Sequence, residues 1–190
     1  MDAMTEASVL QIVTKALEHA AIPYMITGSF ASNFYGIPRT TRDIDIVIAA
    51  SPEQLKDLIQ QLQDKNYYAQ IEDALDALRH HSMFNAIEPS MVWKIDFIMR
   101  KPGTFSQEAF RRRVTGEIAG ITVQISTVED LIIAKLDWAK QGESYRQVED
   151  VASILKMRWE SCDRDYVEKW VNELNLIFQW HAAKRQAGIQ

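Results

Sequence analysis

Residues 43–48 read Asp-Ile-Asp-Ile-Val-Ile, with an isoleucine at every second position. A period of two is typical of a β-strand, in which successive side chains point to opposite faces of the sheet. Asp43 and Asp45 therefore share one face. Two carboxylates on a partly buried face are costly unless a cation neutralises them, and magnesium prefers such oxygen ligands. Taken alone, however, an Asp-x-Asp pair at an exposed strand end is also compatible with simple solvated charge.

A third acid strengthens the metal interpretation. Asp96 lies in the segment 94–98, where it is surrounded by Ile95, Phe97 and Ile98. An aspartate inside such an apolar strand needs a charged or polar partner. If its strand lies beside that of Asp43 and Asp45, three carboxylates converge. We then expect two Mg²⁺ ions roughly 3.5–4 Å apart, with all three acids as catalytic metal ligands. Asp96 is also the candidate general base.

Gly28-Ser29 stands between an expected strand and an expected helix. A glycine lets a phosphate approach the backbone closely, and the start of a helix offers free N–H groups to an anion. We expect Ser29 to be the N-cap of that helix and to add its hydroxyl. Arg39 is placed to contact phosphates, whereas Arg42 should point away from the face of Asp43. An ordinary strand-to-helix turn and a surface arginine are the alternatives.

The remaining pattern predicts an α+β fold, in which a small mixed β-sheet is flanked by helices. Up to residue 126, helices are expected at 6–20, 29–35, 52–65, 74–79 and 106–114, and strands at 24–27, 43–48, 66–72, 83–87, 93–99 and 121–125. Only helices follow, at 128–140, 145–158, 163–175 and 177–186. In the C-terminal tail, aromatic side chains at helical spacings favour packing between helices over base stacking; they are Trp159, Tyr166, Trp170, Phe178 and Trp180.

Composition narrows the class of protein. The chain has 190 residues, a net charge of −5 and one cysteine, Cys162. One cysteine cannot form an intramolecular disulfide, and no apolar run is long enough for a membrane span. We expect a cytoplasmic protein without a secretory signal. The negative charge argues against broad nucleic-acid binding. Arg111, Arg112 and Arg113 form a local basic run, for which a solvated helix face is the favoured interpretation.

The motif residues Gly28-Ser29, Arg39-x-Thr41-x-Asp43-Ile44-Asp45 and the distal Asp96 resemble the signature of the polymerase-beta-like nucleotidyltransferase superfamily. Within it, the Arg-x-Thr-x-Asp-Ile-Asp form is similar to the bacterial AbiEii-type toxins of toxin–antitoxin pairs. The change from mixed helices and strands to helices only predicts a core over residues 1–126 and a C-terminal helical region, 127–190, packed on it; the resemblance implies that this core is a nucleotidyltransferase. It also implies an NTP donor, with Gly28, Ser29, Arg39 and Thr41 at the nucleotide.

A second stretch looks like the helical signature of the same group. It comprises residues 127–136, with Lys135, and residues 144–150, with Arg146 and Asp150. By resemblance, Lys135 contacts the phosphates, and Arg146 and Asp150 belong to the nucleotide pocket. Alternatively, Lys135 lies on a solvated helix face, and Arg146 and Asp150 form a surface pair four residues apart.

The function expected from these motifs is transfer of a nucleoside monophosphate from an NTP to an acceptor hydroxyl. The acceptor is left open between tRNA, a protein and a small molecule such as an aminoglycoside, because this fold serves many acceptors. An antitoxin protein is a further expected partner, and no membrane is expected. The alternative is a catalytically inactive nucleotide-binding or protein-interaction module. The oligomeric state stays open.

Overall fold

The structure is a computed structural model that describes residues 5–90, 92–142 and 144–189. It divides into two compact units. The sheet unit consists of the chain up to Phe30 together with Thr41–Ile125. The helical unit consists of Ala31–Thr40 together with the chain from Ser126 onward. Each unit has its own buried core.

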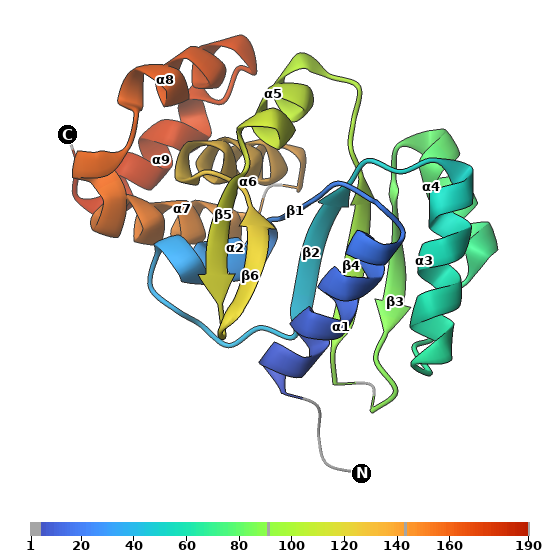
Figure 1. Cartoon of the computed structure of the whole chain (residues 1–190). Helices are drawn as coiled ribbons and strands as arrows, with labels where there is room; N and C mark the ends of the chain where they lie inside the picture. Colours follow the sequence, from blue (N-terminus) through green and yellow to red (C-terminus); the bar gives the residue numbers. More distant parts are fainter. Residues whose placement is uncertain (1–4, 91, 143, 190) are drawn as a thin grey trace. The chain divides into compact units, whose positions relative to one another are not determined.

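The sheet unit is built on a mixed sheet (Figure 1). Over the described residues, its six strands are β1 (Tyr24–Ile26), β2 (Asp43–Ile48), β3 (Met83–Ile87), β4 (Lys94–Met99), β5 (Val114–Ile118) and β6 (Ile121–Ile125). They lie in the order β3-β4-β2-β1-β6-β5. The β2–β4 and β1–β6 pairs are parallel, and the other neighbours are antiparallel. The mixed sheet confirms the predicted α+β class.

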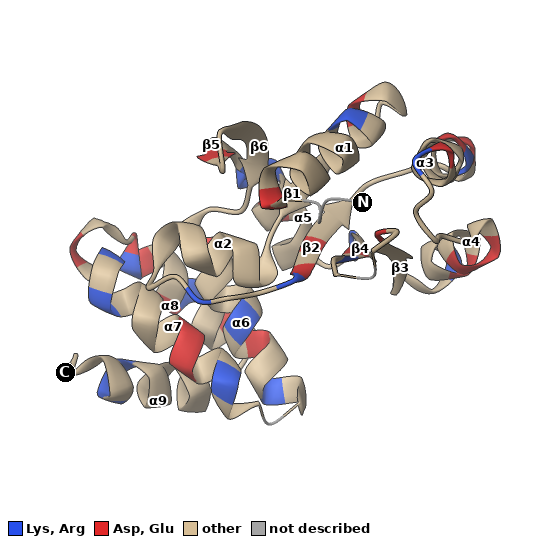
Figure 2. Ribbon diagram, turned by 90° about the horizontal axis from the view of Figure 1, so that it is seen from below, with Lys and Arg blue, Asp and Glu red and all other residues tan. Residues whose placement is uncertain are grey.

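Helices cover the apolar face of this sheet. They are α1 (Glu6–His19), α3 (Pro52–Asp64) and α4 (Ile71–His80); a further helix, α5 (Thr104–Arg112), follows β4 in the chain. In both ribbon views α1 and α3 lie on the same side of the sheet (Figures 1 and 2). The side chains of Ile44, Ile46 and Ile48 are fully buried, as the alternating pattern of β2 requires. The opposite face of β2 therefore carries Asp43 and Asp45.

Local sequence signals explain where these helices begin. Thr5 accepts a hydrogen bond from the Ser8 backbone N–H (3.2 Å), which caps α1. Ser51 and Gln54 form a reciprocal capping box at the start of α3. Such caps satisfy N–H groups that have no partner within the helix.

The helical unit contains most of α2 (Gly28–Tyr35), α6 (Val128–Gly142), α7 (Tyr145–Arg158), a 3₁₀ turn (Trp159–Ser161), α8 (Arg164–Glu173) and α9 (Ile177–Ala187). Trp170 and Trp180 are buried, as predicted for packing between helices, whereas Phe178 is 77% exposed and the prediction is wrong for it. Trp180 is 3% exposed, and its ring centroid lies 6.3 Å from that of Trp159. Cys162 is also buried, and this burial raises the pKa of its thiol to about 12.

Three element predictions are wrong. No strand forms at 66–72, where Tyr68 makes only an isolated bridge to Ile87 and α4 already begins at Ile71. Helix α5 ends at Arg112, two residues earlier than expected. Strand β5 was not predicted, because its sequence, Val-Thr-Gly-Glu-Ile, contains a glycine and its residues are exposed or half-buried. Among the described residues, no helix is both long and apolar enough to cross a membrane.

Candidate active site

The acidic side chains predicted as metal ligands come together on one face of the sheet unit. Strands β2 and β4 pair in parallel, with Asp43 opposite Lys94 and Asp45 opposite Asp96. Directly paired residues of neighbouring strands point to the same face. The prediction that the strand of Asp96 lies beside that of Asp43 and Asp45 is therefore confirmed. We call these four residues the acid face; acidic positions on β2 are red in Figure 2.

Asp96 is the most buried member of the acid face, with 5% of its surface exposed. The side-chain amide of Asn85, on β3, donates a hydrogen bond to Asp96 Oδ1. Lys94 Nζ lies 3.0 Å from Asp96 Oδ2 and 3.8 Å from Asp43 Oδ1. The hydrogen bond to Asp96, together with the nearby negative charges, raises the pKa of Lys94. Asp96 thus has the partners that its apolar sequence demanded.

The donor set fits a hard divalent cation. Three carboxylates face one ammonium group, so the acid face keeps a surplus of negative charge, and carboxylate oxygens are the ligands that Mg²⁺ prefers. Within the described part of the chain, no group of three or more His, Cys, Asp or Glu side chains is already arranged around a single ion position. Lys94 lies among these carboxylates. The assignment of metal to Asp43, Asp45 and Asp96 remains a prediction.

The turn between β1 and α2 lies against Asp45. The Thr27 N–H donates to the Asp45 carbonyl oxygen (2.9 Å). Gly28 follows with φ +61°, and a Cβ built there would overlap Asp45 Oδ2 and come within 2.5 Å of Cγ. Only a glycine can therefore hold this conformation with the carboxylate in place. Asp45 and the candidate phosphate loop are thereby adjacent.

Ser29 is not the N-cap that the sequence suggested. Helix α2 already begins at Gly28, because the left-handed glycine turns the chain directly out of β1. Ser29 is the second residue of the helix and lies in its first turn. Its assignment to the nucleotide phosphates stays a prediction, consistent with the N–H groups that a helix start presents to an anion.

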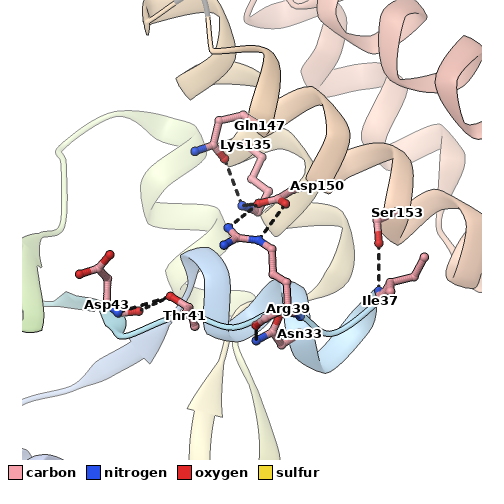
Figure 3. Close-up of polar contacts among 9 residues, drawn as sticks. All are labelled: Asn33, Ile37, Arg39, Thr41, Asp43, Lys135, Gln147, Asp150 and Ser153. Carbon is pink, nitrogen blue, oxygen red and sulfur yellow. Dashed lines mark hydrogen bonds and ion pairs between the residues drawn. The ribbon is translucent and has the colours of Figure 1, made fainter. Parts of the chain in front are cut away.

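A second set of predicted site residues forms a buried charged cluster within the helical unit (Figure 3). Lys135 Nζ lies 2.7 Å from Asp150 Oδ2 and donates a further hydrogen bond to Gln147 Oε1 (3.1 Å). Arg39 approaches Asp150 with two nitrogens, Nε to Oδ1 (3.2 Å) and Nη2 to Oδ2 (3.1 Å). We call Arg39, Lys135, Gln147 and Asp150 the buried cluster.

The segment that carries Arg39 is fixed by its own backbone contacts. Asn33 bonds both the N–H (3.0 Å) and the carbonyl oxygen (2.8 Å) of Arg39 through its side-chain amide. The Ile37 N–H donates to Ser153 Oγ on α7 (2.9 Å). Both contacts are drawn in Figure 3. The guanidinium group of Arg39 is therefore presented to Asp150 by an ordered segment.

Burial alone would raise the pKa of Asp150, but the hydrogen bonds and charges of Arg39 and Lys135 lower it overall. Lys135 is only 4% exposed, so its interpretation as a lysine on a solvated helix face is wrong. The partners of Asp150 are Arg39 and Lys135, and Arg146 is exposed. Two cations share one carboxylate, which leaves the buried cluster with a surplus of positive charge.

Comparison with known proteins gives a match at the level of structure. No protein-family model and no curated protein matches the sequence. The crystal structure of ANT(2")-Ia in complex with adenylyl-2"-tobramycin matches with a TM-score of 0.61 and 15% identity, covering 92% of this chain and 99% of that chain. The solution structure of the antibiotic-resistance factor ANT(2'')-Ia gives 0.58 and 14%, with 95% of each chain covered. The lincomycin-bound lincosamide antibiotic adenylyltransferase LnuA gives 0.54 and 14%, over 80% of this chain and 98% of that chain.

The chain has the nucleotidyltransferase fold. The fold implied by the motif resemblance is thereby confirmed. At these sequence identities the similarity shows the fold alone, because one fold serves many reactions and the reaction depends on the side chains of the site.

Within this nucleotidyltransferase fold, the predicted residues fall into two groups. Gly28, Ser29, Thr41 and the three acids belong to the sheet unit, and Arg39, Lys135, Arg146 and Asp150 to the helical unit. Thr41 lies next to the acid face: its hydroxyl accepts from the Asp43 N–H (3.3 Å). Sequence reasoning missed Lys94 and Asn85. Lys94 was detectable, because it lies two residues before Asp96 on a strand and therefore shares its face; the sequence carried no comparable signal for Asn85.

Proposed function

We propose that this protein is a magnesium-dependent nucleotidyltransferase that moves a nucleoside monophosphate from an NTP to an acceptor hydroxyl. The observation that carries the proposal is the gathering of Asp43, Asp45 and Asp96 on one sheet face, with Gly28 packed directly against Asp45. The carboxylates can bind a cation, and the glycine turn with the helix start can bind a phosphate chain next to it. The nucleotidyltransferase fold supports this assignment.

In the proposed reaction, the acceptor oxygen attacks the α-phosphorus of the NTP. A new P–O bond forms to the acceptor, the bond between the α-phosphorus and the bridging oxygen breaks, and pyrophosphate leaves. Asp96 accepts the proton of the acceptor hydroxyl and passes it to solvent. The backbone N–H groups at Gly28 and Ser29 hold the phosphates. When bound by Asp43, Asp45 and Asp96, magnesium neutralises the charge of the phosphate oxygens.

The acceptor proposed first is a small molecule with hydroxyl groups. Two proteins that share the fold are described as an adenylyltransferase for a lincosamide antibiotic and as a protein bound to adenylyl-tobramycin. The resemblance of the Arg39–Asp45 motif to AbiEii-type toxins supports tRNA or a protein hydroxyl as the acceptor, together with an antitoxin partner. Arg39, Lys135, Arg146 and Asp150 are proposed nucleotide contacts on the same resemblance.

The test uses each of the four NTPs, labelled once at the α-phosphate and once at the γ-phosphate. The purified protein is incubated with Mg²⁺ and either an aminoglycoside and lincosamide panel, total tRNA or a cell extract. We expect the α label to reach an acceptor and the γ label to leave in pyrophosphate. Transfer of the γ label would show a kinase instead.

The variants Asp43→Ala and Asp96→Ala should abolish transfer, whereas Asp57→Ala, which removes an exposed carboxylate of α3, should not. Transfer that survives both site substitutions would rule out the acid face as the catalytic site. Binding of nucleotide without transfer to any acceptor would favour the inactive module.

A further inference from the structure

Lys94 occupies a place in the acid face that the proposed reaction does not explain. It is the direct partner of Asp43 in the β2–β4 register and lies two residues before Asp96. We propose that the Lys94 ammonium takes the place of a second metal ion, so that the site binds one divalent cation per chain. The inference rests on the proposed function and replaces the expectation of two Mg²⁺ ions.

The distances place Lys94 where a second cation would otherwise be needed. Its Nζ is hydrogen-bonded to Asp96 Oδ2 at 3.0 Å and also lies 3.8 Å from Asp43 Oδ1. The Lys94 side chain is 42% exposed, whereas that of Asp96 is only 8% exposed. The ammonium group therefore reaches from the solvent side into the acids, and its position is set by the buried carboxylate.

Each oxygen of Asp96 already has one partner. Asn85 donates to Oδ1 and Lys94 donates to Oδ2. Each carboxylate oxygen has two lone pairs, so each can still coordinate one Mg²⁺ ion, but a second ion at Oδ2 would lie against the Lys94 ammonium. Asp43, Asp45 and Asp96, on the same sheet face, then bind the single ion of the proposed function together.

The charge balance of the acid face also favours one divalent ion. One divalent ion and one ammonium group carry +3, which equals the −3 of the three carboxylates of the acid face. Two divalent ions and the ammonium group would carry +5, and the second ion would lie beside Lys94 as a like charge. Like charges at such short range repel strongly where water is partly excluded.

The experiment counts bound Mn²⁺, a probe for Mg²⁺ whose free form is measured by electron paramagnetic resonance. The full chain is titrated without nucleotide, so that only ions bound by the protein are counted. We expect one ion per wild-type chain without nucleotide. Lys94→Met should bind two ions, or bind the first at least tenfold more tightly. Lys101→Met, which removes an exposed lysine just beyond β4, should behave as the wild type.

Two results would overturn the inference and leave the proposed function standing: two ions bound by the wild type, or identical titrations for Lys94→Met and Lys101→Met. Absence of Mn²⁺ binding by every protein would contradict both proposals. One bound ion without any nucleotide transfer would contradict the proposed function alone. If Lys94→Met does not fold, Lys94→Arg keeps the positive charge and should still bind one ion, and a second ion on this variant would overturn the inference.

Discussion

The acid face of the sheet unit and the buried cluster of the helical unit contain the same kinds of charged group in opposite proportions. The acid face has three carboxylates and one ammonium group. The buried cluster has one carboxylate between a guanidinium and an ammonium group. Exposure also differs, since the side chains of Asp150 and Lys135 are 10% and 5% exposed, against 59% for Asp43 and 42% for Lys94.

This difference predicts that the loss of a carboxylate has opposite effects on stability in the two groups. In the buried cluster each cation bonds directly to Asp150, so removal of the carboxylate leaves a charge in a poorly solvated place. In the acid face, negative charge is in excess, so removal of one carboxylate relieves repulsion and lowers the affinity for a cation. Four measurements test this contrast, in order from the largest expected effect to the smallest.

Asp45→Asn should reduce nucleotide transfer on the order of 10²–10³-fold, the loss typical of one charge-stabilising group in an active site. The free energy of unfolding should not fall, because one of three like charges is removed. Activity is measured by α-label transfer and stability by urea unfolding. Asp57→Asn on α3 is the control, with both quantities unchanged. A clear loss of stability in Asp45→Asn would show that the acid face also supports the fold.

Asp150→Ala should lower the free energy of unfolding by about 3–5 kcal/mol, since it removes the carboxylate that lies 2.7 Å from the buried Lys135 ammonium. Urea unfolding followed by circular dichroism measures this loss. Glu149→Ala, which removes an exposed carboxylate from the same helix, is the matched control and should change stability by less than about 0.5 kcal/mol. Equal stabilities for the two variants would contradict the structural role of the buried cluster.

Gly28→Ala should reduce transfer at least tenfold and lower stability by about 1–2 kcal/mol, the cost of a side chain in the left-handed region. The added Cβ displaces the Asp45 carboxylate. Gly120→Ala is a close control: Gly120 has φ +79°, and its Cβ would meet nothing within 4 Å. It should lose similar stability and keep full activity. Equal transfer activities of Gly28→Ala and Gly120→Ala would show that Gly28 does not contribute to the active site.

The smallest effect is the pH dependence of the buried cluster. The pKa of Asp150 is lowered in the folded protein, so its contribution to stability is complete above the unfolded pKa of about 3.9 and is lost as the pH falls towards the folded value. The difference in stability between wild type and Asp150→Asn should therefore be constant from pH 7 to 5 and shrink below pH 4. A difference that shrinks between pH 7 and 5 would show that another group controls it.

Periodicity predicted the acid face well. The alternation in residues 43–48 predicted a strand with two acids on one face, and Asp96 among apolar neighbours predicted the partner strand. Both inferences depend on a local residue pattern, which can be read from the sequence, and on the free-energy cost of an unpaired buried charge. The same strand periodicity would have placed Lys94 with the acids.

Contacts between distant segments could not be read in this way. Arg39 and Asp150 are 111 positions apart, and no local period links them. The pairing of Arg146 with Asp150 was plausible on helix geometry, yet Asp150 bonds Arg39 and Lys135 instead. Strand β5 was missed because its residues face outward and its stability comes from pairing with β6.

Cys162 provides a built-in reporter for the helical unit. It is the only cysteine in the sequence, is 7% exposed, and has a thiol pKa of about 12, so almost no thiolate exists at neutral pH. Thiolates rather than thiols react with disulfide reagents. Labelling of the native protein should therefore be slow and limited by the opening of its surroundings. The rate at which the thiol is modified then measures how often this unit opens, without any engineered probe.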